Sequence, residues 1–309
     1  MPSVICIGSA LIDELYFCNE NVIAGTSNPA NLSRNIGGVL TNVAFHLAYL
    51  DVDIEYITVL GNDAEGKWVM DELHKAGIKI ENVALVNDPT GKYVSFLNAD
   101  GSLHAAACVD VCEKYLNPSF LEGKVETLLT ADIIITDTNI SIESIKWLID
   151  FSTIHHKTLI IEPVSVAKSR KLAALDIQNV FMITPNEDEL FSICQNTKEK
   201  ESDMIKTLLS RGVQNIWLRK GASGSIKYNN EKEISLAAVK IEIIDSTGAG
   251  DAALAGWIVG YLNNYNELEC LQLGHTLAFE VLQIKGAVNH HIKFSSLLES
   301  RNKYYKDAK

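Results

Sequence analysis

Two carboxylates and a cluster of small residues lie close together near the end of the chain, in the segment Asp245-Ser246-Thr247-Gly248-Ala249-Gly250-Asp251. Residues 241–244 before it, Ile-Glu-Ile-Ile, predict a strand, and the small and apolar residues after it predict a buried helix. A turn at a helix start directs several backbone N–H groups and the positive end of the helix dipole toward one point. Glycines in that turn allow a ligand to approach closely. The segment therefore predicts a site for an anion, most often a phosphate.

Asp251 ends this turn, where a carboxylate would repel a bound anion. One interpretation is structural: the side chain caps the helix. The other is chemical: the carboxylate takes a proton from a hydroxyl that attacks the γ-phosphate of a nucleotide. The N–H groups would then stabilise the charge that shifts onto the phosphate oxygens. The segment alone leaves both interpretations open.

Four segments of the chain, in the same order, resemble the motifs of the ribokinase-like (PfkB) family of carbohydrate kinases. The G-G-x-x-x-N-x-A pattern of the family matches residues 37–44, G-x-D-x-x-G matches 61–66, N-x-x-E matches 186–189 and D-[ST]-T-G-A-G-D matches 245–251. The resemblance implies an ATP-dependent kinase with Asp251 as its catalytic base. The residues that would form the anion hole with their N–H groups are Gly248, Ala249, Gly250 and Asp251.

The resemblance also assigns residues to the nucleotide and its cations. Asn186 and Glu189 would organise Mg²⁺ and the phosphates, largely through water, as Mg²⁺ prefers. The same two residues have good capping chemistry for a helix start, and the two roles are compatible. Asp245 and Thr247 match positions that bind a monovalent cation, usually K⁺, in many relatives.

Residues 219–224, Arg-Lys-Gly-Ala-Ser-Gly, match the strand end that binds the nucleotide in the family. Arg219 stands where Thr is common, which replaces a hydroxyl contact by a basic residue near the phosphates. Lys220 is either a second basic contact or a solvated loop charge. The residues expected to contact the nucleotide on this side and around the adenine pocket are Arg219, Gly221, Gly224, Lys285 and Asn289.

The sugar contacts of the family match residues in the first part of the chain. Asp13 follows the first predicted strand, and a carboxylate suits a diol because it can accept two hydrogen bonds. Gly37 and Gly38 allow close approach, and Asn42 both donates and accepts. A second interpretation of Asn42 is the N-cap of a helix predicted at residues 42–50.

The run Glu162-Pro163-Val164-Ser165-Val166-Ala167-Lys168 departs from the D-x-N or D-x-x of most relatives and resembles the pseudouridine kinases within the family. That resemblance implies transfer of a phosphoryl group from ATP to the 5′-hydroxyl of pseudouridine. The alternatives are another sugar or nucleoside, such as ribose, fructose or adenosine, and a sensor that binds without turnover.

Short apolar runs alternate with amphipathic stretches along the whole chain. Strands are predicted at residues 4–8, 54–60, 133–136, 158–161, 180–183 and 215–218, and helices at 42–50, 64–76 and 187–194. This alternation predicts an open, mostly parallel sheet with helices on both faces. With the resemblance, it indicates a single ribokinase-like α/β domain over residues 1–309, with three layers in the order α/β/α.

Two stretches, about 11–33 and 90–112, interrupt the alternation with aromatic and β-branched residues and predict a small second sheet, interpreted as a lid. The turn at residues 99–101 suits a hairpin. Polar residues in the first stretch would contact the base of a nucleoside substrate, although such residues are also common in plain loops. The candidates are Ser27, Asn28 and Asn31, with Tyr93 or Phe96 as stacking partners.

The composition disfavours several other functions. The 309 residues carry 27 basic and 39 acidic side chains, a net charge of −12, which opposes general binding to nucleic acid. There is no P-loop motif, and the first strand is not followed by G-x-G-x-x-G. No apolar run reaches the ~18 residues that a membrane-spanning helix needs.

The remaining expectations concern location and assembly. The six cysteines are scattered without a zinc-binding cluster and indicate free thiols in a reducing compartment. No signal peptide is visible before the first strand, so the expected location is the cytoplasm. A homodimer through the lid is expected, because exposed strand edges invite pairing and relatives often dimerise there.

Overall fold

An eight-stranded sheet lies at the centre of the structure, a computed structural model that describes residues 3–195 and 200–305. In spatial order its strands are β14 (Glu233–Leu236), β13 (Ser225–Tyr228), β12 (Asn215–Arg219), β11 (Met182–Ile183), β10 (Thr158–Glu162), β9 (Ile133–Asp137), β1 (Ser3–Ile7) and β4 (Asp53–Ile57). Neighbouring strands are parallel from β12 to β4, and β13 and β14 continue the sheet antiparallel. The predicted fold class is confirmed.

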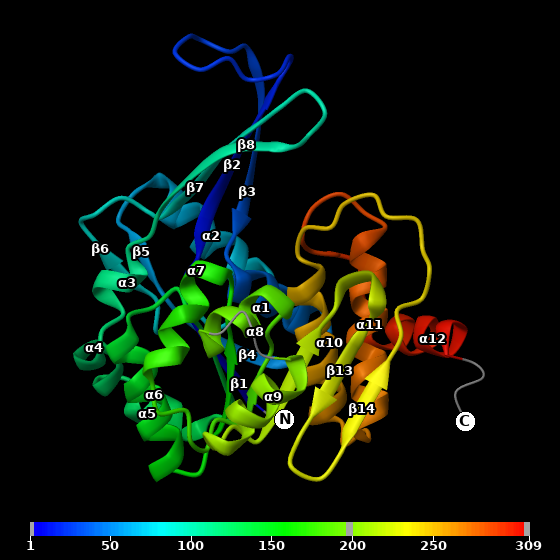
Figure 1. Cartoon of the computed structure of the whole chain (residues 1–309). Helices are drawn as coiled ribbons and strands as arrows, with labels where there is room; N and C mark the ends of the chain where they lie inside the picture. Colours follow the sequence, from blue (N-terminus) through cyan, green and yellow to red (C-terminus); the bar gives the residue numbers. More distant parts are fainter. Residues whose placement is uncertain (1–2, 196–199, 306–309) are drawn as a thin grey trace.

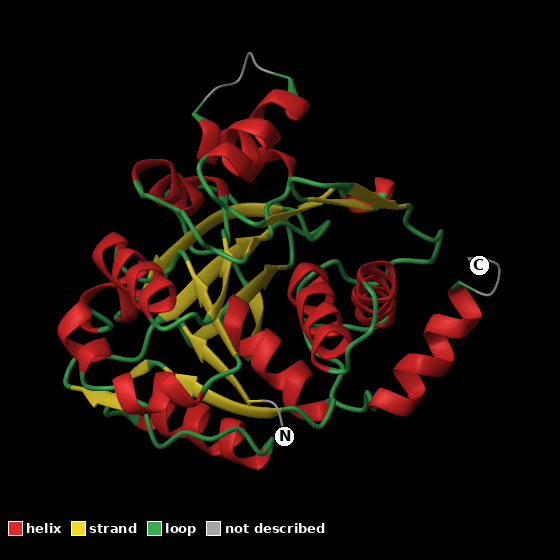
Figure 2. Ribbon diagram, turned by 90° about the horizontal axis from the view of Figure 1, so that it is seen from below, coloured by secondary structure: helices red, strands yellow, loops and turns green. Residues whose placement is uncertain are grey.

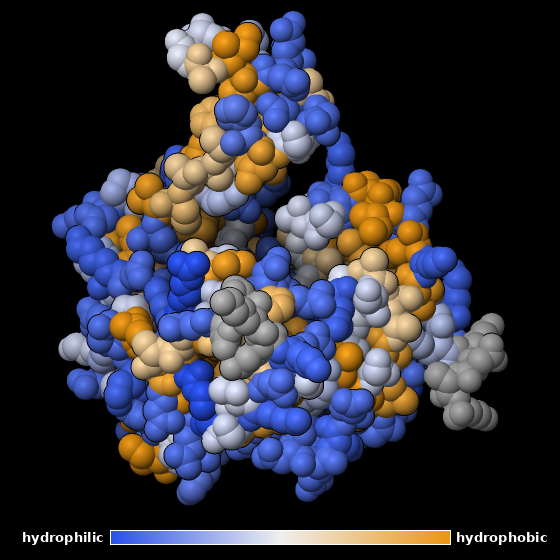
Figure 3. Space-filling view, in the orientation of Figure 1, coloured by the Kyte–Doolittle hydropathy of each residue, from blue (hydrophilic) through white to orange (hydrophobic). Residues whose placement is uncertain are grey.

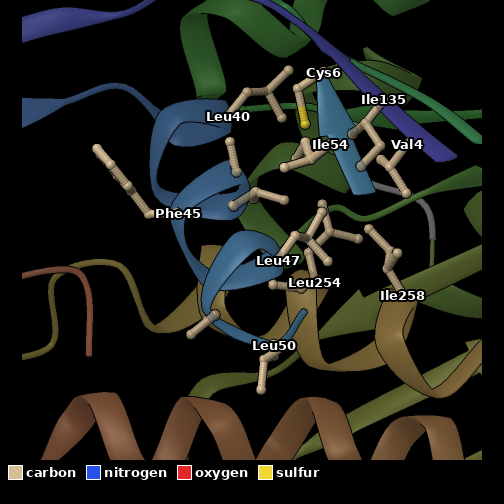
Figure 4. Close-up of a cluster of buried hydrophobic side chains, with 14 of the residues drawn as sticks. Val4, Cys6, Leu40, Phe45, Leu47, Leu50, Ile54, Ile135, Leu254 and Ile258 are labelled. Carbon is tan, nitrogen blue, oxygen red and sulfur yellow. The ribbon is translucent and has the colours of Figure 1, made fainter. Parts of the chain in front are cut away.

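Helices cover both faces of this sheet (Figure 2). Because successive side chains of a strand point to opposite faces, β1 contributes to two separate cores. Val4 and Cys6 pack on one face, whereas Ile5 and Ile7 pack on the other. Figure 4 shows part of the first core, where the side chains of Leu40 and other residues of the first helix meet those of the sheet. Strands that are buried on both faces produce the continuous apolar runs seen in the sequence.

The helices divide between the two cores. Those of the first core are α1 (Val39–Tyr49), α2 (Ala64–Lys75), α10 (Ala249–Leu262), α11 (Glu267–Leu282) and α12 (Phe294–Tyr304). Those of the second are α3 (Cys112–Tyr115), α4 (Pro118–Glu122), α5 (Val125–Thr130), α6 (Ile142–Ile154), α8 (Glu187–Cys194) and α9 (Glu201–Ser210). Three short pieces are α7 (Val166–Ser169) and the 3₁₀ turns η1 (Arg170–Ala174) and η2 (Gly221–Ser223). Within the described residues, none of these helices combines the length and the apolar character needed to cross a bilayer.

The order of the strands reverses beside β1, which lies between β4 and β9. In open parallel sheets, such a reversal marks a crevice outside the carboxyl ends of the strands, where ligands bind. The carboxyl ends of β1, β9, β10, β11 and β12 share one edge, because these strands are parallel. The topology therefore places a binding site at that edge.

A four-stranded sheet stands out from the main body on the side of this edge (Figure 1). In spatial order its strands are β3 (Ala30–Gly37), β2 (Leu11–Cys18), β7 (Lys92–Leu97) and β8 (Leu103–Val109). The predicted hairpin joins β7 to β8, with Gly101 at a φ of 82°. All four strands overlap the two stretches predicted to form the lid, and the closing movement of that lid stays a prediction.

Two strand predictions are wrong. Residues 54–60 form two strands, because β5 (Val59–Gly61) leaves the main sheet and pairs with β6 (Ala84–Val86). The apolar run continues across this break, so the sequence does not mark it. Residues 241–244 form no strand: Ile243 and Ile244 are 59% and 60% exposed, and the N–H of Ile244 donates to the carbonyl of Leu282 at 2.8 Å.

The first helix begins earlier than predicted. Gly38 turns the chain with a φ of 107°, and α1 starts directly after it at Val39. A Cβ on Gly38 would also clash with the carbonyl oxygen of Ser9. Both the positive φ and this clash require glycine at the position. Asn42 therefore lies inside the first turn, and the interpretation of Asn42 as the N-cap is wrong.

The family-like motif at residues 61–66 forms a structural clip. Asp63 is the N-cap of α2, and its Oδ1 accepts from the N–H of Gly66 at 2.7 Å. The same carboxylate accepts from the N–H of Thr90 at 2.8 Å and from its hydroxyl at 2.7 Å. These bonds tie the start of α2 to the chain that enters β7.

We expect Asp63→Ala to lower the free energy of unfolding by ~2–3 kcal/mol, because it removes an N-cap and leaves the polar groups of Thr90 without their acceptor. Urea unfolding measures this loss. The control is Asp100→Ala, whose carboxylate bonds only to Ser102 in an exposed turn and should cost less than ~1 kcal/mol. Equal losses in the two variants would contradict the clip.

Candidate active site

Polar side chains stand at the carboxyl ends of four neighbouring strands. Asp137 ends β9, Glu162 ends β10, Thr184 follows β11 and Arg219 ends β12. The first three are buried, which polar groups tolerate only when they have partners. Figure 3 shows a hollow between the four-stranded sheet and the main body, on the side to which these strand ends point.

The turn before α10 has the geometry expected of an anion site. Gly248 is the N-cap of α10 with a φ of 74°, and a Cβ there would lie 2.5 Å from the carbonyl oxygen of Ala287. The N–H of Ala252 donates to the carbonyl of Gly248 at 2.8 Å. The N–H groups that precede Ala252 in α10 have no acceptor within the helix. The N–H of Gly250 therefore points out of the helix start.

Asp251 lies in the first turn of α10 and does not cap it, because Gly248 is the N-cap and no side-chain cap bond forms. Instead, its Oδ2 accepts a hydrogen bond from Nδ2 of Asn42 at 2.8 Å. Asn42 lies in the first turn of α1, so the starts of two helices meet at this carboxylate. The capping interpretation of Asp251 is wrong.

Burial raises the pKa of Asp251 to about 7. The hydrogen bond from Asn42 and the charge of Arg219 oppose this rise, while the carboxylates of Glu162 and Asp13 add to it. A carboxylate with a pKa near neutrality is a stronger base than an ordinary aspartate and is still ionised in a large fraction of molecules at pH 7.

The predicted sugar contacts lie beside this carboxylate. Asp13 is on β2, and burial raises its pKa to about 6. A Cβ on Gly37 would clash with the carboxylate of Asp13. Gly38 starts the helix that carries Asn42, and Asp13 lies within electrostatic range of Asp251. The structure thus gathers these predicted residues around one carboxylate.

The guanidinium of Arg219 lies among the strand ends. Its Nη2 donates to Oε1 of Glu162 at 2.6 Å and also to the carbonyl of Thr184. The hydroxyl of Thr184 donates to the other oxygen of Glu162. Nη1 lies beside the anion turn, since a Cβ built on Gly250 would be 2.7 Å from it. Arg219 and Glu162 therefore belong to the same site as Asp251.

Asn186 and Glu189 form the capping box predicted for the start of α8. Oδ1 of Asn186 accepts from the N–H of Glu189, and Oε2 of Glu189 accepts from the N–H of Asn186, both at 2.9 Å. Burial and the nearby carboxylate of Glu162 raise the pKa of Glu189. No group of three or more His, Cys, Asp or Glu side chains in the described residues is arranged to hold a metal. The oxygen groups present fit a Mg²⁺ held mainly by water and phosphate oxygens.

The loop after β12 contains two glycines with different surroundings. Gly221 opens η2, and a Cβ there would meet nothing within 4 Å. Gly224 lies against the carbonyl oxygen of Leu236 in β14, which a Cβ would clash with, so it has a structural role. Nζ of Lys220 bonds to the carboxylate of Glu201 at 2.7 Å. Of the two interpretations of Lys220, the structure favours the loop charge.

Asp245 ties the anion turn to the loop after α11. Its Oδ1 accepts from the N–H and the hydroxyl of Thr247 at 2.9 and 2.7 Å, and its Oδ2 accepts from the N–H of Gly286 at 3.0 Å. Lys285 is exposed in the same loop and lies within electrostatic range of Asp245. Asn289 lies further along, where its Oδ1 accepts a backbone N–H at 3.1 Å.

The structure does not bring Ser27 and Asn28 to the site. Both lie in the loop between β2 and β3, at the outer end of the four-stranded sheet (Figure 1). Oδ1 of Asn28 accepts from the N–H of Ile23 at 2.9 Å, and its Nδ2 donates to the carbonyl of Ile23 at 3.0 Å. The amide of Asn28 is engaged within its own loop and Ser27 is exposed, so contact of these two residues with the substrate stays a prediction.

Strand register separates the two aromatic candidates. Tyr93 pairs with Asp13 across β7 and β2, so the two side chains share a face. Phe96 is three positions further along and lies on the opposite face, where its ring stacks on that of Tyr16 with centroids 5.4 Å apart. Tyr93 therefore shares the face of the predicted sugar contact, and Phe96 does not.

The sequence analysis missed Asp137 and Asn139. Asp137 accepts from the N–H and the amide of Asn139 at 2.9 and 2.7 Å, and burial raises its pKa to about 7. Nζ of Lys168 donates to Oδ1 of Asn139, and the hydroxyl of Ser9 donates to the carboxylate of Asp110. Polar residues directly after an apolar strand are a general sign of a site at this edge, and that sign is present here.

The site combines a helix start with the geometry of an anion site, a partly buried carboxylate with a raised pKa, and the predicted sugar contacts beside it, an arrangement that suits phosphoryl transfer. A family model described as "pfkB family carbohydrate kinase" matches residues 1–293. The chain belongs to the pfkB family. It is a sugar or nucleoside kinase, in a family of ATP-dependent phosphotransferases.

Individual relatives agree with this assignment. The pseudouridine kinase of Escherichia coli strain K12 is 26% identical over 266 residues, which cover 83% of this chain and 84% of the relative. The guanosine-inosine kinase of Exiguobacterium acetylicum is 23% identical, and the match covers 91% of this chain and 95% of the relative. The structure of Arabidopsis thaliana ribokinase complexed with ribose and ATP is 23% identical and superposes with a TM-score of 0.87 over 97% of this chain and 98% of that one.

The raised pKa of Asp251 predicts an acid limb in the pH profile. The base must be ionised to accept a proton, so kcat/KM for the acceptor should fall by about tenfold per pH unit below about pH 7 and level off above it. Asn42→Leu removes a hydrogen bond that favours the ionised form and should move the limb to higher pH. Initial rates at saturating ATP between pH 5 and 9 test this, and a flat profile would contradict it.

Proposed function

We propose that the chain phosphorylates the 5′-hydroxyl of pseudouridine, with ATP as the donor, to give pseudouridine 5′-phosphate. The observation that carries the reaction is the partly buried carboxylate of Asp251, held by Asn42 at 2.8 Å in the first turn of α10, beside Gly250 of the anion turn. The substrate is supported by the pseudouridine kinase relative and by the run at residues 162–168.

In the proposed reaction, Asp251 accepts the proton of the primary hydroxyl as its oxygen forms a bond to the γ-phosphorus. The bond from that phosphorus to the β–γ bridging oxygen breaks, and ADP leaves. The N–H groups at the start of α10 stabilise the charge on the transferring group. Water must be excluded for the hydroxyl to compete, and closure of the four-stranded sheet over the site would supply that exclusion.

The nucleotide would lie along the carboxyl edge from Arg219 toward the loop after α11. Gly221 offers open space for close approach, and Lys285 and Asn289 would border the adenine. Mg²⁺, when bound near Asn186 and Glu189, would neutralise phosphate charge. Asp245 and Thr247 would support a K⁺ site, which predicts faster turnover in KCl than in the same concentration of tetramethylammonium chloride.

The sugar would lie between Asp13 and Asp251, with Gly37 and Gly38 beneath it. Asp13 is suited to accept two hydrogen bonds from the 2′- and 3′-hydroxyls. Tyr93 shares the face of Asp13 and would stack on the base. The proposed location of this reaction is the cytoplasm, where ATP is available and thiols stay reduced.

We propose a homodimer formed through the four-stranded sheet. β8 is an edge strand of that sheet, and all of its residues are exposed. Leu103 is 56% exposed and Val109 65%. An apolar edge with unpaired backbone groups is normally covered or paired. Light scattering on the purified protein should give a mass near twice 34.0 kDa.

Asp251→Asn should lower kcat by at least ~10²-fold with little change in substrate affinity. The variant should also be more stable than the wild type at pH 8. The folded pKa is about 7, against an ordinary value of 3.8, so the native state loses stability as the pH rises from about 4 to 7. Removal of the ionisable group should restore up to ~4 kcal/mol.

Turnover assays and urea unfolding at pH 8 test this pair of effects. Lost activity with higher stability separates a chemical role from misfolding. Near-normal turnover in the variant would overturn the assignment of the base.

A substrate panel tests the acceptor: ADP release with pseudouridine, uridine, adenosine, ribose and fructose at equal concentration with Mg-ATP. We expect the highest kcat/KM for pseudouridine. Uridine is the matched control, because it differs in the atom that joins the base to the sugar. Turnover of ribose or fructose without pseudouridine would refute the proposed substrate, and binding without ADP release from any of them would favour the sensor.

A further inference from the structure

Two departures from the family pattern meet in space. Arg219 stands where relatives commonly have Thr, and Glu162 stands where they have Asp. The two positions are far apart in the sequence, yet the side chains form a hydrogen-bonded ion pair at 2.6 Å. The two departures are coupled, because the longer side chain of Glu162 reaches the guanidinium of Arg219. The pair therefore needs an explanation beyond the general pattern that the sequence resembles.

One edge of the guanidinium is fully anchored. The two hydrogens of Nη2 go to Glu162 and to the carbonyl of Thr184. Glu162 is itself held by the hydroxyl of Thr184, and both residues are buried. A guanidinium held at three strand ends has little freedom to move, so its position is set before any ligand binds.

The other edge of the guanidinium has hydrogen-bond donors without an acceptor in the described residues. The side chain of Arg219 is 16% exposed, and its Nη1 makes no hydrogen bond within the described residues. A Cβ on Gly250 would lie 2.7 Å from Nη1, so this nitrogen lies beside a residue of the anion turn. Its charge also acts on Asp251. A free, fixed donor therefore adjoins both the anion site and the base.

We propose that Arg219 is a catalytic arginine, whose Nη1 donates to the γ-phosphoryl group during transfer, and that Glu162 is the positioning residue that aims it. The inference rests on the kinase activity. Arginine suits the role because one edge of its planar fork can be anchored while the other binds phosphate oxygens. A lysine has a single nitrogen and cannot satisfy both sets of acceptors in this way.

The charges around the site favour this role over passive nucleotide binding. The carboxylates of Glu162, Glu189 and Asp251 all act on Arg219, so without its charge they would oppose the approach of ATP. A fixed positive charge at the point where charge develops stabilises the transition state more than the ground state. The effect should therefore lie mainly in kcat.

The experiment is a double-mutant cycle with Arg219→Thr, Glu162→Asp and the double variant, which recreates the common family pair. We expect Arg219→Thr to lower kcat by ~10²–10³-fold with less than a ~5-fold change in KM for ATP. Arg219→Lys should recover only part of the loss. Glu162→Asp should lower kcat in the wild type but add little in the Arg219→Thr background, because it acts through the guanidinium.

A further measurement gives a readout that a structural ion pair would not move. Calorimetry compares ADP alone with ADP plus magnesium and aluminium fluoride, which mimics the transferring phosphoryl group. Arg219→Thr should weaken the mimic and leave ADP alone unchanged. Lys220→Thr is the matched control, because it removes the neighbouring cation, which bonds to Glu201, and it should leave kcat unchanged.

The kinetics use pseudouridine, or the fastest substrate of the panel. The inference is overturned if Arg219→Thr changes only thermal stability, or if it raises KM for ATP while kcat stays normal. These outcomes are separate from failure of the proposed reaction. An inactive Asp251→Asn with a normal Arg219→Thr refutes only the role of Arg219, whereas an active Asp251→Asn refutes the reaction itself.

Discussion

The site depends on keeping the partly buried carboxylate of Asp251 beside the anion turn. Burial raises the pKa of Asp251 and so makes it a better base, but the ionised form is costly inside the protein. Asn42 and Arg219 reduce that cost without removing it, because one donates a hydrogen bond and the other supplies charge. The folded protein would therefore be more stable if Asp251 were neutral. Such a cost is expected where the needs of activity and of stability conflict.

Close helix packing holds that arrangement in place. Gly256 of α10 lies against the carbonyl of Leu273 in α11, and Gly274 of α11 lies against the carbonyl of Ala253 in α10, each leaving only 2.6–2.7 Å for a Cβ. The same glycine of α11 faces the ring of Trp217, two residues before Arg219 on β12. The start of α10 and the end of β12 are thus fixed through one contact region, which keeps the base and the guanidinium in register.

The features that could be predicted from the sequence are those set by local sequence patterns. The fold class, the turn at Gly248 and the gathering of Asp13 and Asn42 near Asp251 follow from periodicity, small residues and motif resemblance. The pairing of Arg219 with Glu162 could not be predicted, because two strand ends meet only through the sheet. Residues 241–244, Ile-Glu-Ile-Ile, alternate enough to predict a strand, but the N–H of Ile244 bonds to the carbonyl of Leu282 and no strand forms.

The run at residues 162–168 now divides into two parts with different chemistry. Its first residue, Glu162, contacts Arg219 and Thr184 on the phosphoryl side. Its last residue, Lys168, donates to Asn139, and the charge of Lys168 also acts on Asp137. The same lysine influences Cys108, which lies in the strand row of Tyr93 and Asp13. One short connection after β10 therefore links the group that would stabilise transfer to the polar cluster of Asp137 and Asn139. A change of acceptor specificity should arise at the Lys168 end, where it can leave the phosphoryl side intact.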